Sequence, residues 1–533
     1  MPSSVGRTLS RAGRAAKAGD LKVATALFRE VLERYPGNRR AQAGLQALGR
    51  GTVASLVAEA KALEAAGNAD AAEAKWAAAA TLAPEHAEIG LALVRCRLDL
   101  GRAAGALEAS DTVLAQHPGH HRALDFRGLA LRELGRDSEA EASHRAALGH
   151  GVADAGPLNH LGILARARGE LTAASEFFRK ALALSPGTPH LHHNLARATT
   201  YREGDSHLGQ MRAQLERYSP EDVSAAPLHF AMFKALDDVG ERDKAFSHLA
   251  EGNRLCKSAQ RFDIRREAAR FAFIKALCMG SPPKCEARAE QRGPVFIIGL
   301  PRSGTTLVER ILSQAPDAHA CGELQVATTA CASLLRRAQA RGGSPALTPD
   351  DMDCLRKDLL EGYAPFFRDD RVILDKMPQN FRWAGFLLTA LPDARIVHIT
   401  RDPVPLAWSL YRHLFAGRGI GFVYDFADIA TYMLLHRDLM AFWHKRFPGR
   451  ITEIAYGDLV ADPATTARRL VAACDLTWSE ACLAPERAEG PVLTASAEQV
   501  RRPIYTGSDE AWQRYERHLL PLCEALRVAG VNA

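Results

Sequence analysis

The sequence VFIIGLPRSGTT, at residues 295–306, joins a short apolar run to a loop rich in glycine and hydroxyl side chains. Gly299 and Gly304 have the spacing of the phosphate-binding loop G-x-x-x-x-G-K-[ST], but Thr305 stands at the lysine position. Arg302 supplies a positive charge within the loop instead. A loop that opens a helix presents free backbone N–H groups and a positive dipole end to an anion. The segment therefore predicts a site for a tetrahedral anion that does not use a loop lysine.

Further polar residues follow short β-branched runs in the same half of the chain. Lys376 comes directly after VILD, Arg401 after RIVHIT, and Tyr456 ends ITEIAY. Each run is followed by a helix-like segment, and this alternation predicts a mostly parallel sheet that is covered on both faces. Ligands of such sheets bind at the carboxyl ends of the strands, so we expect these side chains to gather beside the loop.

The N-terminal half contains a repeat. Glycines recur at a spacing of 34 residues, at Gly67, Gly101, Gly135 and Gly169. Alanine follows each glycine after five residues, and proline follows three of the four after seventeen. This period resembles the tetratricopeptide repeat, a pair of helices, in which glycine suits the turn and proline ends the second helix. Gly19 fits the pattern but precedes Gly67 by 48 residues, which predicts an insertion or an extra helix near residues 40–55.

Repeats of this kind stack, because one helix pair cannot bury its apolar face alone. The array predicts a binding surface for a protein or peptide or, equally, a scaffold or dimerisation surface, and no anchor residue decides between them. The segment GSPPKCEARAEQRG, at 280–293, has the glycine, proline and charge content of a linker. We therefore expect an all-α repeat array with its linker at residues 1–285 and an α/β domain at residues 286–533.

The composition is that of a globular protein, with 47% apolar and 24% charged residues among 533. The formal charge of +6 suits an anionic ligand. The sequence has no run of five or more basic residues, so a nucleic-acid partner is not predicted. Neither a membrane span nor a secretory signal is expected, since no apolar run is long enough. The ten scattered cysteines contain no C-x-x-C pair, which predicts reduced thiols in a cytoplasmic protein. The oligomeric state is not indicated.

A second motif indicates which anion the loop binds. In VHITRDPVPLAWSLY, Ser409 follows Arg401 by eight residues, and together with the loop this sequence resembles the PAPS-dependent sulfotransferases. PAPS is adenosine with a 3′-phosphate and a 5′-phosphosulfate, and its product is adenosine 3′,5′-bisphosphate. The resemblance implies that Arg401 and Ser409 bind the 3′-phosphate, which ATP lacks, and that the loop binds the 5′-phosphosulfate. The loop residues concerned are Arg302, Ser303, Gly304, Thr305 and Thr306.

Four further motifs narrow the resemblance to the tyrosylprotein sulfotransferase branch and its bacterial relatives fused to tetratricopeptide repeats. They are Cys321-Gly322-Glu323, LDKMPQNF with Lys376, AYGDLV with Tyr456, and SAEQVRRP with Ser496 and Arg502. The resemblance implies that Glu323 accepts the proton of an acceptor hydroxyl as general base. Lys376 and Ser496 would steady the bridging oxygen of the donor, while Arg302 neutralises charge on the phosphosulfate. Tyr456 and Arg502 are assigned to the donor pocket.

Several alternatives stay open at this level. A sulfuryl group carries less charge than a phosphoryl group, so fixed cations can handle it, and no metal ion is expected in the reaction. His319 is the rival base, since other sulfotransferase branches use histidine. A metal-dependent kinase with a degenerate phosphate loop is one other class of function, and a non-catalytic interaction protein is another. The Arg401…Ser409 pair argues against the first, and Lys376 with Glu323 against the second. The acceptor could be a protein tyrosine, a carbohydrate, a lipid or a small metabolite.

Overall fold

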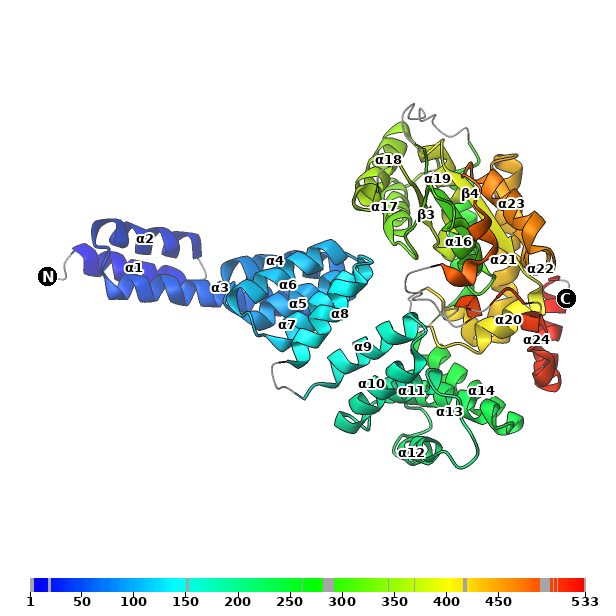
Figure 1. The fold of residues 1–533 in the computed structure, drawn as a ribbon. Coiled ribbons are helices and arrows are strands. Elements are labelled where there is room, and N and C mark those ends of the chain that lie inside the picture. Colours follow the sequence, from blue (N-terminus) through cyan, green and yellow to red (C-terminus); the bar gives the residue numbers. More distant parts are fainter. Residues whose placement is uncertain are drawn as a thin grey trace. The chain divides into compact units, whose positions relative to one another are not determined.

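The computed structural model describes residues 4–17, 21–149, 153–260, 262–280, 292–343, 345–368, 370–415, 419–488, 499–501, 503–505 and 507–531. Packing divides the chain into two compact units, Met1–Leu161 and Gly162–Ala533. The first unit is helical in its described part, and the second joins further helices to a β-sheet (Figure 1).

The first unit consists of helices that pack in consecutive pairs. They are α1 Ser4–Lys17, α2 Leu21–Arg34, α3 Arg39–Ala65, α4 Ala69–Leu82, α5 Ala87–Asp99, α6 Ala103–Gln116, α7 His121–Glu133, α8 Asp137–Leu148 and most of α9 Ala155–Ala167 (Figure 1). The turn glycines of the repeat have φ values of 70° to 85°, in the left-handed region: Gly67, Gly101, Gly135 and Gly169. The alanines of the repeat are fully buried: Ala72, Ala106, Ala140 and Ala174. The predicted tetratricopeptide-like helix pairing is confirmed.

The insertion predicted near residues 40–55 takes the form of one long helix. Helix α3 has 27 residues, whereas α5, in the corresponding place of the next repeat, has 13. The difference is about four helical turns, so the extension keeps the buried face of the helix in phase. Ala41 and Ala60, near the two ends of α3, are accordingly both buried.

The second unit continues with helices and then forms a five-stranded sheet in its described part. The first helices are α10 Leu171–Leu184, α11 Pro189–Arg197, α12 Ser206–Leu215, α13 Ala226–Asp238, α14 Arg242–Gln260 and α15 Ile264–Leu277. The strands are β1 Val295–Gly299, β2 Ala318–Ala320, β3 Val372–Asp375, β4 Arg395–Thr400 and β5 Ile451–Ala455, in the order β2-β3-β1-β4-β5. All of these pairings are parallel, as predicted. Strand β2 was not predicted, because its three residues, AHA, show neither alternation nor β-branching.

Helices cover both faces of the sheet. They are α16 Thr305–Leu312, α17 Val326–Arg341, α18 Pro349–Tyr363, α19 Ala384–Ala390, α20 Pro403–Tyr411, α21 Phe426–Arg446, α22 Tyr456–Ala461, α23 Pro463–Ala473 and α24 Glu516–Val528. Val295 and Ile297 of the central strand share one apolar core with α16 and α23. Phe296 and Ile298, which alternate with them, share the other core with α17, α18, α19 and α21. The central strand is therefore buried on both sides, which explains its unbroken apolar sequence.

The core on the second face extends into the repeat helices α13, α14 and α15. The ring centroids of Phe233 and Trp408 lie 6.2 Å apart. Asn253 Nδ2 donates a hydrogen bond to the carbonyl oxygen of Tyr411 at 3.1 Å, which joins α14 to α20. Helices on both sides of the linker sequence therefore belong to one packed unit. The boundary predicted between residues 285 and 286 lies outside the described residues.

Two further sequence-based expectations bear on the surroundings of the protein. The nine cysteines in the described part of the chain have free thiols, and most are buried. Within the same described ranges, we find no helix with the length and apolar character that crossing a bilayer requires. The predicted cytoplasmic location stays a prediction.

Candidate active site

One predicted site residue follows each strand of the sheet, and all of them lie at the carboxyl edge. Along the strand order β2-β3-β1-β4-β5 they are Glu323, Lys376, Arg302, Arg401 and Tyr456. Neighbouring strands are about 4.8 Å apart, so the row spans about 20 Å. An edge of this length can hold an extended ligand at one end and a second reactant at the other.

The loop after β1 has the shape of an anion cradle. Gly304 caps α16 with φ 113°, and a Cβ atom there would lie 2.5 Å from Cδ2 of Tyr456, so only glycine fits. Thr305 and Thr306 open the helix, whose first N–H groups have no partner within the helix. The Ser303 Oγ atom is buried without a hydrogen-bond partner in the described part of the chain. These groups fit a phosphate or sulfate group in the loop.

Arg302 is held in an uncommon backbone conformation beside this cradle. Its φ of 71° lies in the left-handed region, which is costly for a residue with a side chain and is most frequent at functional sites. Its Nε donates a hydrogen bond to Ser409 Oγ at 3.2 Å, and its carbonyl oxygen accepts one from Arg401 Nη1 at 2.9 Å. The predicted pair Arg401 and Ser409 thus converges on the loop arginine.

Positive charge is concentrated around Arg302. Burial, together with the charges of Arg401, Arg412 and Arg197, lowers the pKa of its guanidinium to about 9. Arg302 remains cationic at neutral pH. Four arginines around one buried point make a strongly anion-attracting site, because repulsion among them is relieved when an anion binds.

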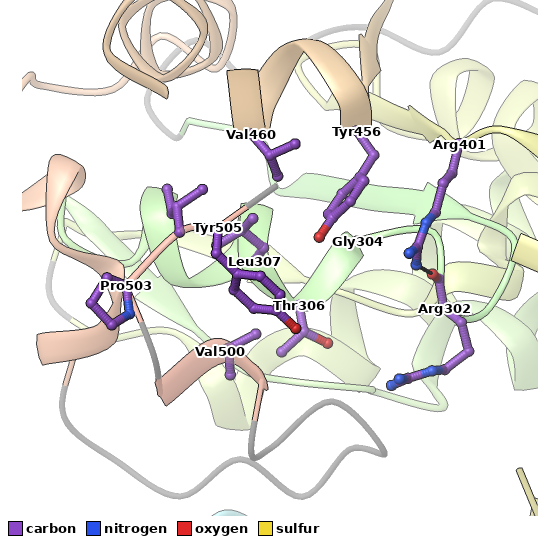
Figure 2. A pocket seen from close by; sticks show the side chains of 11 residues that line it. Arg302, Gly304, Thr306, Leu307, Arg401, Tyr456, Val460, Val500, Pro503 and Tyr505 are labelled. Atoms are coloured by element: carbon purple, nitrogen blue, oxygen red, sulfur yellow. Dashed lines mark hydrogen bonds between the residues drawn. The ribbon is translucent and has the colours of Figure 1, made fainter. Parts of the chain in front are cut away.

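A hollow opens over the loop (Figure 2). It is lined by Arg302, Gly304, Thr306, Leu307, Arg401, Tyr456, Val460, Val500, Pro503, Ile504 and Tyr505. Figure 2 shows the two arginines and Tyr456 on one side and Val500, Pro503 and Tyr505 on the other. The hollow combines cations with apolar and aromatic walls, as small-molecule sites do.

Two acidic residues in the site were not found from the sequence. The first is Asp509, whose carboxylate accepts a hydrogen bond from Arg401 Nε at 2.8 Å. Arg401 also lies over the ring of Tyr456, with 4.6 Å between the guanidinium carbon and the ring centroid. No motif singled out Asp509, because it lies 108 residues from Arg401 in a segment without periodicity.

The second is Glu309 on α16, which is 8% exposed. Its Oε1 accepts a hydrogen bond from the backbone N–H of Gly322 at 2.9 Å, and its Oε2 lies 4.0 Å from Lys376 Nζ. Lys376 is fully buried and lies 2.6 Å from Glu323 Oε1. The ammonium of Lys376 thus joins the two carboxylates, and Glu309 holds the Gly322 turn that carries Glu323. A buried lysine needs such partners, since an unpaired buried charge is very costly.

Asp375, next to Lys376, is buried and accepts a hydrogen bond from the hydroxyl of Tyr363. Burial, with a smaller contribution from the charge of Glu309, raises the pKa of Asp375 from 3.8 to about 7. Between these two values the folded chain binds more protons than the unfolded chain, so the Asp375 contribution to stability falls as pH rises.

We therefore expect Asp375→Asn to lose less stability than the wild type between about pH 5 and about pH 8. The measurement is the thermal midpoint of each protein at both pH values. Asp353→Asn, which changes an exposed aspartate of α18, serves as the control and should follow the wild type. Equal pH dependence in wild type and Asp375→Asn would contradict the shifted titration.

The remaining predicted residues are placed as follows. His319 is half-buried within β2, and burial lowers its pKa. Ser496 and Arg502 lie outside the described residues, so their assignments stay predictions. The structure thus groups the loop, Arg401 and Tyr456 around the hollow, joins Ser409 to Arg302, and pairs Glu323 with Lys376.

Comparison with known proteins assigns the family of the sheet domain. Residues 294–480 match the model of the sulfotransferase family. This region is similar to sulfotransferase domains. It contains all five strands, the loop and the Glu323–Lys376 pair.

The chain is also similar to curated proteins, two of which have sulfotransferase names. An uncharacterized protein of Aquifex aeolicus (strain VF5) is 31% identical over 74% of this chain and 53% of its own length. The omega-hydroxy-beta-dihydromenaquinone-9 sulfotransferase Stf3 of Mycobacterium tuberculosis is 31% identical over 20% of this chain and 29% of its own. Protein-tyrosine sulfotransferase 1 of Danio rerio is 23% identical over 41% of this chain and 65% of its own length. The chain thus spans about half of the first relative and less than a third of the second.

Solved structures resemble the helical part. The MamA protein is 17% identical and matches 36% of this chain and 94% of its own, with a TM-score of 0.26. A thermophilic tetratricopeptide-repeat protein of Thermus thermophilus is 20% identical and matches 37% of this chain and 98% of its own, with a TM-score of 0.25. Scores this low carry no inference about function.

Proposed function

We propose that the protein transfers the sulfuryl group of PAPS to an acceptor hydroxyl. The observation that carries this proposal is the lysine-free loop of a sulfotransferase domain, with Arg302 buried in it and joined to both Arg401 and Ser409. A kinase loop would carry a lysine to the β- and γ-phosphates and an acidic residue for Mg²⁺. Here arginines and hydroxyl groups surround the anion cradle instead.

The donor would lie along the β1, β4 and β5 part of the carboxyl edge. The loop N–H groups and Arg302 hold the 5′-phosphosulfate, while Arg401 and Ser409 hold the 3′-phosphate. Tyr456 and the apolar residues of the 500–505 segment provide walls for the nucleoside. Ser496 and Arg502 complete the donor site in this proposal.

Calorimetry with adenosine 3′,5′-bisphosphate and with ADP tests the donor assignment. We expect clearly tighter binding of the bisphosphate, with EDTA present, because only this ligand offers a 3′-phosphate to Arg401 and Ser409. Equal affinities, or binding that requires Mg²⁺, would favour the degenerate kinase loop instead.

Arg401→Ala should weaken bisphosphate binding by about 1.5–3 kcal/mol, the value of a hydrogen bond to a charged group. The control is Arg437→Ala, since Arg437 lies on α21 and donates a hydrogen bond to the Gly530 carbonyl instead. Bisphosphate affinity that is unchanged in Arg401→Ala would remove Arg401 from the 3′-phosphate site.

Asp509→Asn should have the opposite effect. The Asp509 carboxylate contacts the guanidinium assigned to the phosphate, so it competes with that anion. Removing its charge should tighten bisphosphate binding by about 1 kcal/mol, or about fivefold, as expected for a partly exposed pair. The same titration measures it, and weaker binding in Asp509→Asn would mean that Asp509 supports the site rather than competing for it.

The chemical step depends on Glu323 and Lys376, which follow strands β2 and β3 at the other end of the carboxyl edge. The acceptor oxygen attacks sulfur, the bond from sulfur to the bridging oxygen breaks, and the bisphosphate leaves. Glu323 takes the acceptor proton, and its side chain is 44% exposed and thus accessible. Lys376 holds the Glu323 carboxylate and places a positive charge beside the bridging oxygen as it gains charge. No step requires a metal ion.

The acceptor carries a hydroxyl group, of which a protein tyrosine is one form. The names of the relatives include a protein-tyrosine sulfotransferase and a sulfotransferase for an omega-hydroxy menaquinone derivative. These two acceptors share the hydroxyl and little else. Sulfation of a tyrosine peptide but not of an aliphatic alcohol would assign the first class, and the reverse result the second.

The first unit would recruit a macromolecular acceptor. Its stacked helices offer a larger surface than a small molecule needs, and a tethered acceptor gains effective concentration. Deleting residues 1–152 should therefore raise KM for a protein acceptor and leave bisphosphate affinity unchanged. An unchanged kcat/KM for that acceptor would show that the first unit has another role, such as dimerisation.

A further inference from the structure

Outside the candidate active site, the described residues contain two clusters in which three side chains could share a metal ion. One joins Asp125, His144 and His160 in the first unit. Asp125 Oδ1 lies 2.7 Å from His144 Nδ1 and 2.9 Å from His160 Nδ1. These are ordinary hydrogen-bond lengths, so this cluster is explained without an ion.

The other cluster joins His398 of β4, Glu453 of β5 and His444 in the last turn of α21. His398 and Glu453 are direct partners in the parallel register of β4 and β5, so their side chains point to the same face of the sheet. Helix α21 packs on that face. Two neighbouring strands and one helix thus bring three ligand atoms within 4.8 Å of one another.

The separations in this second cluster suit a metal ion. Glu453 Oε2 lies 3.2 Å from His398 Nδ1 and 3.5 Å from His444 Nε2. Zinc bonds of about 2.0–2.1 Å in a tetrahedron place ligand atoms about 3.3–3.4 Å apart. The first separation is at the upper limit of an N–H···O hydrogen bond, about 2.7–3.2 Å, and the second is beyond it. Moreover, His444 Nε2 is buried and has no hydrogen-bond partner in the described part of the chain.

The surroundings also suit a metal ligand. His398 Nε2 lies 3.3 Å from His436 Nε2, on the same helix as His444. Donation from His398 Nε2–H to His436 leaves a lone pair on His398 Nδ1, directed at the cluster, as a second contact does for most metal-bound histidines.

We propose that His398, His444 and Glu453 form a zinc site that fastens the end of α21 to strands β4 and β5. Two histidines and one glutamate are an established zinc donor set, with water at the fourth position. The side chains of His444 and Glu453 are 36% and 52% exposed, which gives an ion access from solvent. Strands β4 and β5 lead directly into Arg401 and Tyr456, so the ion would stiffen the frame of the donor pocket without entering it.

Zinc titration of the full chain, first stripped with EDTA, tests the proposal by calorimetry and by thermal midpoint. We expect one zinc ion per chain to be bound at this site and to raise the midpoint, whereas Mg²⁺ does neither, since nitrogen ligands disfavour it. His444→Ala and Glu453→Gln should each lower the affinity at least about tenfold, the smallest loss seen on changing groups around metal sites. The fold without zinc should be unchanged, because both side chains are partly exposed.

Two control variants locate the bound ion. His86→Ala removes an exposed histidine outside both clusters and should bind zinc as the wild type does. His160→Ala disrupts the first cluster and should also retain the ion. Absence of zinc binding in the wild type would overturn the proposal. Equal affinity in the wild type, His444→Ala and Glu453→Gln, or loss of the ion in His160→Ala alone, would overturn it as well.

Discussion

Glu323→Gln lowers kcat by about 10²–10⁴, the usual contribution of a general base, in our account of the reaction. The amide keeps the size of the side chain and an oxygen that can accept a hydrogen bond from Lys376, but it cannot take the acceptor proton. Bisphosphate affinity should stay close to that of the wild type, because Glu323 follows β2, away from the hollow over the loop. The measurement is single-turnover transfer from PAPS at saturating donor.

Two companion variants make this result specific. Glu361→Gln alters an exposed glutamate of α18 and should leave kcat unchanged. His319→Ala tests the rival base. An active Glu323→Gln together with an inactive His319→Ala would show that histidine, not glutamate, accepts the proton.

Removal of residues 1–285 should abolish folding, whereas removal of residues 1–152 should not. The core of the sheet domain continues into α13, α14 and α15. Phe271, for example, lies 5.9 Å from Phe381 and 5.6 Å from Tyr432 between ring centroids. Each large apolar side chain that loses its burial costs about 1.5–3 kcal/mol, and a handful of them equals the whole stability of a typical domain, about 5–15 kcal/mol.

The thermal midpoint and bisphosphate binding of the two truncated chains check this prediction. We expect a cooperative transition and near wild-type affinity for residues 153–533, and neither for residues 286–533. A folded, bisphosphate-binding 286–533 fragment would show that the domain is independent of the repeat helices despite the shared core.

Much of the fold could be predicted from the sequence, because its signals are local. The 34-residue spacing of glycines depends on turns that need positive φ, and the structure has such φ values at Gly67, Gly101, Gly135 and Gly169. The parallel sheet was predicted from β-branched runs that alternate with helices. The shared core was not predictable, because contacts such as that between Asn253 and Tyr411 join residues 158 apart.

In the candidate site, too, residues with a local sequence signal could be predicted and long-range contacts could not. Residues at strand ends were found because parallel topology brings strand ends together. Asp509 and Glu309 were missed, since a carboxylate that pairs with a distant cation has no sequence pattern of its own. The contact between Lys376 and Glu323 was also not expected: each had a separate role, and only the geometry shows that one holds the other.

The measurement that tests the central claim most directly follows label transfer from two donors in parallel. The full chain is incubated with sulfur-labelled PAPS and EDTA, or with γ-phosphate-labelled ATP and Mg²⁺, together with tyrosine peptides and a cell lysate as acceptors. We expect acceptor labelling from PAPS alone, lost in Glu323→Gln and retained in Glu361→Gln. Labelling from ATP but not from PAPS, or equal labelling by wild type and Glu323→Gln, would contradict a PAPS-dependent transferase with Glu323 as its base.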